Sequence, residues 1–101
     1  MRVVRADSRR QQARGLARRD AIAPDVGLLI PRCRSVHTFT MRFALDLVWL
    51  DSAGRPVRVD RGVPPRRVRT CLRARAVLEC SAGQAVAFLA QPWRMAELAE
   101  L

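Results

Sequence analysis

The segment from residue 35 to residue 51, SVHTFTMRFALDLVWLD, restricts the fold of this chain more than any other part of the sequence. Its second half, LDLVWL, is apolar on both faces of an extended chain, which is typical of a buried central strand. The turn sequence DSAGRP follows, in which Gly54 tolerates a positive φ, and then the alternating sequence PVRVD. The sequence therefore predicts a β-hairpin formed by residues 46–50 and 56–60.

Further strands and several short helices are expected around this hairpin. Strands are predicted at residues 2–4, in the apolar run GLLIP that ends at Pro31, and in RAVLEC, residues 75–80. Helical patterns occur in residues 6–20, 81–91 and 92–101. This order predicts an α+β domain, with a small, mainly antiparallel and strongly curved β-sheet or barrel and two or three short helices.

The length and composition are those of one small domain. The chain has 101 residues, half of them hydrophobic, so we expect a single domain over residues 1–101 with its own core. It contains no apolar run close to the roughly 20 residues of a membrane helix. The N-terminal sequence MRVVRADSRR lacks the apolar region of a signal peptide. We therefore expect a cytoplasmic protein without a transmembrane segment.

The chain is strongly basic, and all of its basic residues are arginine. Nineteen arginines and nine acidic residues give a net charge of +10. One explanation of the high arginine content is a GC-rich genome, which encodes arginine wherever the surface carries a cation. The other is attraction to polyanions. Residues 55–75 hold eight arginines and a single acid, Asp60, so weak, salt-sensitive nucleic-acid binding is an alternative function. Against it, Phe39, Phe43 and Trp49 are expected in the core, which leaves Trp93 as the one exposed ring for base stacking.

The cysteines do not form a recognisable metal or redox motif. Cys33, Cys71 and Cys80 are widely spaced, and no C-x-x-C pair occurs. We expect buried, reduced thiols that act as small hydrophobic side chains. No metal site and no cofactor are predicted.

Several segments together resemble the uncharacterised family called domain of unknown function 192. The resemblance runs through ARGLARRD, the long segment GLLIPRCRSVHTFTMRFALDLVWLD, AGRPVRV and RAVLECSAGQA, and it covers about residues 6–90. It implies the family's fold. The family has no established substrate, activity or cofactor, so the resemblance implies none for this chain.

An enzymatic site around His37 is the third functional hypothesis. A histidine beside a carboxylate can act as a general acid or base, and Asp46 is a candidate partner. In a continuous strand, however, the two residues would lie on opposite faces and ~30 Å apart. Only a tight turn near residues 43–46 could bring them together, and no known catalytic motif accompanies them. We therefore expect His37 to be a hydrogen-bonded residue beside the core.

The arginine and acid of the same segment suggest a structural pair. Arg42 and Asp46 share a face of an extended chain and could form an ion pair that fixes the local backbone. The functional alternative is that Arg42 binds an anionic ligand as a bidentate donor. Glu79 lies between apolar neighbours, so we expect it to pair with an arginine or a helix end.

The function that these observations favour is a non-catalytic binding or accessory domain. Function is usually carried by loops on a rigid sheet, and RGVPPRRVR is a proline-rich basic loop of that kind. We expect an interaction surface that includes the 61–75 loop, for a protein partner or an anionic ligand. The candidate binding residues are His37, Arg42, Asp46, Arg66, Arg67 and Arg69.

Overall fold

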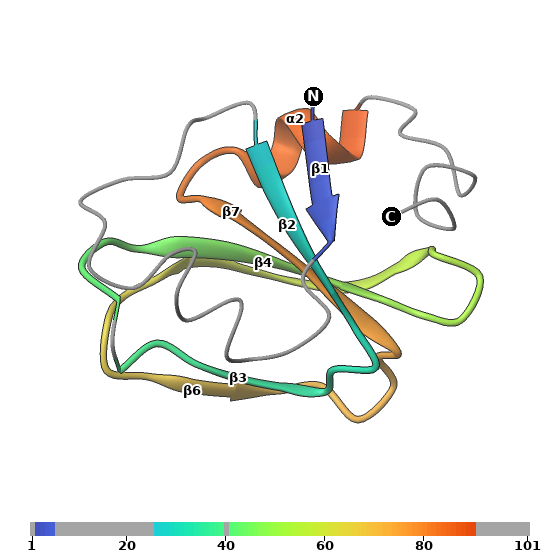
Figure 1. Ribbon diagram of the computed structural model, residues 1–101, viewed down its shortest axis with the longest axis horizontal. Coiled ribbons are helices and arrows are strands. Elements are labelled where there is room, and N and C mark those ends of the chain that lie inside the picture. Colours follow the sequence, from blue (N-terminus) through green and yellow to red (C-terminus); the bar gives the residue numbers. More distant parts are fainter. Residues whose placement is uncertain (1, 6–25, 40, 91–101) are drawn as a thin grey trace.

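The computed structural model describes residues 2–5, 26–39 and 41–90. Seven strands and one helix follow one another in this part of the chain (Figure 1). They are β1 (Arg2–Arg5), β2 (Val26–Pro31), β3 (Ser35–His37), β4 (Leu45–Leu50), β5 (Pro56–Val63), β6 (Val68–Thr70), β7 (Ala76–Ser81) and α2 (Ala85–Ala90).

Two sheets carry the fold. The larger has the strand order β1-β2-β7-β4-β5, in which β1 and β2 are parallel and all other neighbours are antiparallel. Strands β3 and β6 form a separate antiparallel ribbon that lies below the larger sheet in Figure 1. The α+β class and the mainly antiparallel sheet are confirmed.

The predicted barrel is wrong. The five-stranded sheet ends in two different strands, β1 and β5, that do not pair with each other, so it is open. The segment from residue 35 to residue 51 also does not form one continuous strand, because β3 ends at His37, β4 begins at Leu45, and the two strands belong to different sheets. Of the two or three predicted helices, α2 is present in the described residues. The other two, at 6–20 and 92–101, lie outside those residues.

The predicted hairpin is confirmed as β4 and β5. Their register pairs Val48 with Val59, and the turn between them contains Gly54 at a φ of 79°. Asp51 stabilises this turn, since its Oδ1 accepts hydrogen bonds from the backbone N–H groups of Ala53 and Arg55, both at 2.9 Å.

Strand β4 is buried along its whole length because both faces of the sheet are covered. Leu47 and Trp49 point into a core shared with Val36 of the β3–β6 ribbon. Val48 and Leu50 point into a second core, on the side of α2. The continuous apolar pattern of LDLVWL therefore reflects a sheet between a ribbon and a helix.

Helix α2 packs closely on β2 at a glycine. A Cβ atom on Gly27 would lie 2.8 Å from Cε1 of Phe88 and 2.9 Å from Cδ1 of Leu78, closer than van der Waals contact allows. Phe88 is fully buried there. Within the described residues, no helix is long and apolar enough to cross a membrane.

Candidate binding site

The β3–β6 ribbon presents one face to the core and the other to solvent. Its register places Val36 opposite Arg69 and His37 opposite Val68. Val36 is buried, so the alternation of the strand turns its neighbour His37 outward. Val68 is 52% exposed on the same outer face. The ribbon therefore presents an apolar side chain beside the only histidine of the chain.

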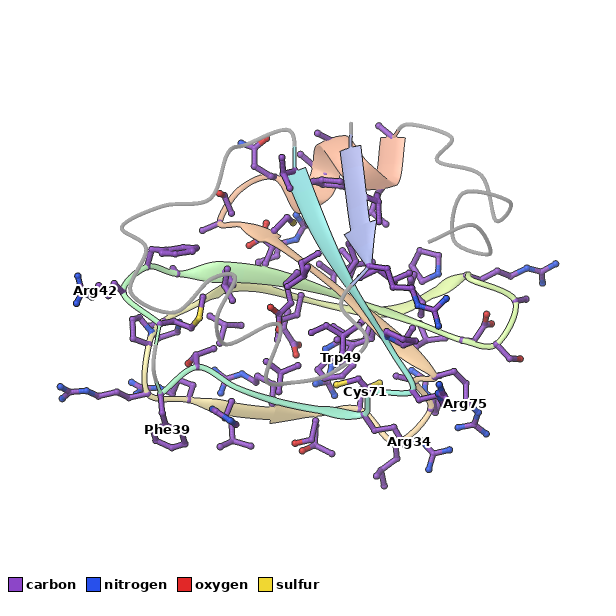
Figure 2. All side chains as sticks on the ribbon, viewed as in Figure 1. Arg34, Phe39, Arg42, Trp49, Cys71 and Arg75 are labelled. Atoms are coloured by element: carbon purple, nitrogen blue, oxygen red, sulfur yellow. The ribbon has the colours of Figure 1, made fainter. Side chains whose placement is uncertain are left out.

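Phe39 extends this outer face. Phe39 is 59% exposed, and the centroid of its ring lies 5.8 Å from that of the His37 ring, at an interplanar angle of 37°. The expectation that Phe39 belongs to the core is wrong, because Thr38 takes the inward position after Val36 and the alternation turns Phe39 outward. Figure 2 shows Phe39 at the lower edge of the molecule, pointing away from the sheet.

Thr38 fixes the backbone beneath this face. Its hydroxyl donates to the carbonyl of Pro64 at 2.7 Å and accepts from the backbone N–H of Arg67 at 2.9 Å. Its backbone carbonyl accepts from the N–H of Arg66 at 3.1 Å. Sequence reasoning missed this role, although the alternation of Val36 and Thr38 on one face was a signal that could have revealed it.

The predicted basic loop is shorter than expected. Of residues 61–75, β5 takes 61–63 and β6 takes 68–70, so the connection between these strands is residues 64–67. Arg66 adopts a φ of 64°, a left-handed conformation that is strained for a residue with a side chain. Arg66 and Arg67 are exposed, and Arg69 is half-buried. These candidate arginines therefore belong to the same ribbon as His37.

Asp46 occupies a different environment. Its side chain is fully buried, and Oδ1 accepts a hydrogen bond from the N–H of Gly62 at 2.8 Å. Oδ2 accepts from the N–H groups of Gly83 at 2.9 Å and Ala85 at 3.0 Å. One carboxylate thus joins β4 to β5 and to the start of α2, where backbone N–H groups lack partners within the helix.

Neither of the predicted partners of Asp46, His37 and Arg42, lies beside its carboxylate. Arg42 is exposed and its side chain points outward at the edge of the molecule (Figure 2). His37 is exposed on the ribbon and contacts the ring of Phe39. The structure therefore does not assemble a histidine–aspartate site from His37 and Asp46. Glu79 is fully buried on β7, between Leu28 and Leu47 of the neighbouring strands.

The three cysteines are buried free thiols. Burial, together with the nearby carboxylates of Asp46 and Glu79, raises the pKa of Cys80 to about 12. This thiol therefore stays protonated at neutral pH, and a protonated thiol is a poor nucleophile and metal ligand. Within residues 2–5, 26–39 and 41–90, no group of three metal-ligating side chains is present.

A polar network links the hairpin to the core on the ribbon side. The indole N–H of Trp49 donates to Oδ2 of Asp60 at 2.9 Å, and Arg58 donates to both carboxylate oxygens at 3.1 and 2.8 Å. Burial alone would raise the pKa of Asp60, but the hydrogen bonds from Arg58 and Trp49 outweigh it and lower this pKa. The hydrogen bond to Asp60 also raises the pKa of Arg58. This network has the features of a structural ion pair.

Two solved structures share this fold. One is a protein of unknown function from Novosphingobium aromaticivorans DSM 12444, with a TM-score of 0.72 and 19% identity over 88% of this chain and 69% of its own. The other, from Sinorhizobium meliloti 1021, is described as a "putative transcription regulator", with a TM-score of 0.72 and 25% identity over 89% of this chain and 75% of its own.

No curated protein matches the chain significantly. The model of the DUF192 family, described as an uncharacterized ACR, matches residues 1–92. This match covers most of the 101 residues and includes the segments on which the resemblance was based. The chain therefore belongs to the domain of unknown function 192 family.

Proposed function

We propose that this protein is a non-catalytic binding domain that acts in the cytoplasm and docks an acidic protein segment on the outer face of the β3–β6 ribbon. The observation that carries the proposal is the exposed ring of Phe39, which lies against His37 and beside an arginine-rich turn. Aromatic side chains and arginines are the residues that most often supply binding energy at protein interfaces.

Charge complementarity selects the partner. Arg66 and Arg67 are exposed at the turn next to Phe39, and each carries a positive charge that an acidic segment would neutralise. Arg42 is exposed on the turn between β3 and β4 and is a further candidate contact. We therefore expect a segment that combines glutamate or aspartate with an apolar side chain that packs on Phe39 and Val68.

Rigidity supports the same role. The hydrogen bonds of Thr38 hold the turn of Arg66 and Arg67 in place before any partner binds. A preformed surface loses less conformational entropy on binding than a loop that must first become ordered.

A second candidate function is binding of single-stranded nucleic acid by the same face. Its specific support is Phe39, because an exposed ring beside arginines can stack on a base while the guanidinium groups contact phosphates. The description of the Sinorhizobium meliloti protein as a "putative transcription regulator" agrees with this candidate. The exposed aliphatic Val68 favours a protein partner, since it offers no surface for stacking.

Two defined probes separate these functions, a fluorescent peptide that alternates glutamate and leucine and a short fluorescent oligothymidine. Fluorescence anisotropy would measure the binding of each probe to four proteins: the wild type, Phe39→Leu, Phe39→Ala and the double variant Arg66→Ala/Arg67→Ala. Leucine keeps apolar contact area but loses the aromatic face. We expect the peptide to bind Phe39→Leu better than Phe39→Ala, and the double variant to bind it weakly.

The alternative outcomes are equally clear. Oligothymidine binding that is stronger than peptide binding and is lost in both Phe39 variants would replace the proposal with the nucleic-acid function. Peptide binding that is unchanged in Phe39→Ala and disappears at moderate salt would reduce the interaction to non-specific charge attraction. The matched control is the double variant Arg55→Ala/Arg61→Ala, which removes two exposed arginines of the β4–β5 hairpin and should leave peptide binding largely unchanged.

A further inference from the structure

A second site, independent of the ribbon face, lies at one end of the larger sheet, where β2 and β4 end and β7 begins. The register pairs Ala76, the first residue of β7, with Pro31 at the end of β2 and with Leu50 at the end of β4. A hollow of about 220 Å³ opens there, and its apolar lining residues are Leu29, Pro31, Leu50 and Ala76. Pro31 and Ala76 are partly exposed and form its apolar floor.

Arginines surround this floor. Arg32 and Arg75 line the hollow, and both also line an adjoining hollow of about 300 Å³ together with Arg34. Arg5 lines the first hollow from β1. The positive charge therefore comes from separate segments of the chain: β1, the residues between β2 and β3, and the residue before β7.

Two of these guanidinium groups are oriented by one backbone oxygen. The carbonyl of Ala74 accepts a hydrogen bond from Nε of Arg34 at 3.1 Å and from Nη1 of Arg75 at 3.3 Å. This shared acceptor holds two like charges next to each other. In Figure 2 the two side chains lie together at the lower right, at the other end of the molecule from Phe39. Such a pair repels unless an anion lies near it.

Among the described residues, no acid forms an ion pair with Arg32, Arg34 or Arg75. Asp51 is the carboxylate that lines the first hollow, and its Oδ1 already accepts hydrogen bonds from two backbone N–H groups of the hairpin turn. Asp60, on strand β5, is already paired with Arg58. Arg32, Arg34 and Arg75 thus keep donor groups that can bind a ligand.

The backbone at Arg32 is unusual in a way that fits a binding site. Its φ of 51° is left-handed, a conformation that glycine adopts without strain. Here the position carries an arginine that lines both hollows. Strained residues of this kind concentrate at ligand sites, where the surrounding structure holds them in place.

We propose that this site binds a small organic anion, with its carboxylate or phosphate group between Arg32, Arg34 and Arg75 and its apolar part on the floor formed by Pro31 and Ala76. Guanidinium groups match both head groups because they can donate two parallel hydrogen bonds. The size of the hollows suits a short aliphatic or small cyclic acid. All three arginines are exposed, so binding is weak and salt-sensitive.

Four probes test the proposal: acetate, inorganic phosphate, hexanoate and hexyl phosphate. Titrations followed by NMR would monitor the backbone amides of residues 32–34 and 74–76 and the Nε–H groups of the arginines. We expect the hexyl probes to bind at least about fivefold more tightly than acetate and phosphate, because the floor adds apolar contact. The ratio between hexanoate and hexyl phosphate identifies the preferred head group.

Variants locate the site. Arg34→Gln and Arg75→Gln should each weaken hexyl binding about fivefold or more, and Arg75→Lys should have an intermediate effect because it keeps the charge but not the planar donor pair. Arg61→Gln is the control: it removes the same charge from β5 at the opposite end of the β4–β5 hairpin, and should leave binding unchanged. Circular dichroism would verify that each variant folds.

Two results would overturn the proposal. Equal binding of all four probes would show that the apolar floor contributes nothing. Equal weakening by Arg61→Gln and Arg34→Gln would show attraction to the net charge of the protein and no site. Phe39→Ala should leave anion binding intact, so failure at this site and failure of the ribbon function are distinguishable.

Discussion

On each side of the larger sheet, one buried polar side chain joins separate segments of the chain through backbone hydrogen bonds, but the surroundings of the two side chains differ. On the helix side, the side chain of Asp46 joins β4 to β5 and α2, and it is fully buried. On the ribbon side, the side chain of Thr38 joins the turn after β3 to the turn before β6, but its neighbour Phe39 is exposed. A buried polar group that accepts or donates several backbone hydrogen bonds fixes the architecture in both places.

The difference between the faces lies in what surrounds that polar group. Around Asp46 the neighbouring side chains complete a core, so we expect the junction to serve stability. Around Thr38 the fixed backbone carries exposed apolar and basic side chains, which add little to folding and are free to contact a partner. Stability and surface presentation can therefore be tested separately by substitutions on the two faces.

The largest expected effect is that of Asp46→Ala. This change leaves three backbone N–H groups without their acceptor, and that of Ala85 is buried. An unsatisfied buried group costs roughly 1–3 kcal/mol, and the loss of the buried carboxylate also leaves a cavity. We expect the free energy of unfolding to fall by about 3 kcal/mol or more, measured by urea denaturation. Asp46→Asn keeps one acceptor oxygen, so its free energy of unfolding should lie between those of the wild type and Asp46→Ala. A fully stable Asp46→Ala would show that the junction is not structural.

Thr38→Val is expected to have a smaller effect on stability and a local effect on the ribbon. Valine fills the same volume but leaves the N–H of Arg67 without the hydroxyl acceptor, so we expect a loss of about 1–3 kcal/mol. Amide hydrogen exchange should become faster at residues 64–68 before it changes in β4. Thr38→Ser, which keeps the hydroxyl, is the control. Uniformly faster exchange across both sheets would argue against a local role.

The pH dependence of stability should report the Asp60 network. The pKa of Asp60 is lowered in the folded protein by its hydrogen bonds from Arg58 and Trp49, despite the opposing effect of burial. Its stabilising contribution is therefore present above the unfolded pKa of about 4 and is lost as the pH falls through the lower folded pKa. Thermal unfolding between pH 7 and pH 2 should show this loss, and Asp60→Asn should remove that part of the pH dependence.

The smallest effect on folding is expected at Phe39. Because Phe39 is 59% exposed, Phe39→Ala should change the free energy of unfolding by no more than about 0.5 kcal/mol. Truncation of a buried phenylalanine such as Phe88 costs about 3–5 kcal/mol. Denaturation of both variants in parallel measures the contrast. A large loss of stability in Phe39→Ala would place this ring in the core after all and remove the basis of the proposed docking surface.

The sequence by itself determined the local elements whose pattern depends on neighbouring residues. The hairpin of β4 and β5, the strand that ends at Pro31 and the strand of RAVLEC follow from apolar runs, alternation and turn residues, which act over a few positions. The alternation also placed Val36 and Thr38 on one face, and both are buried. The family followed from the motifs of the same segments.

Only the tertiary structure decided how these elements combine into a site. The hydrogen bonds of Asp46 connect residues 16 to 39 positions apart in the chain, and no local pattern encodes such contacts. The break between β3 and β4 leaves Phe39 exposed and separates His37 from Asp46. Arg32, Arg34 and Arg75 come together because β2 and β4 end where β7 begins, at one end of the larger sheet. Spacing predicts which face a residue occupies, but strand order and packing decide which distant residues it meets.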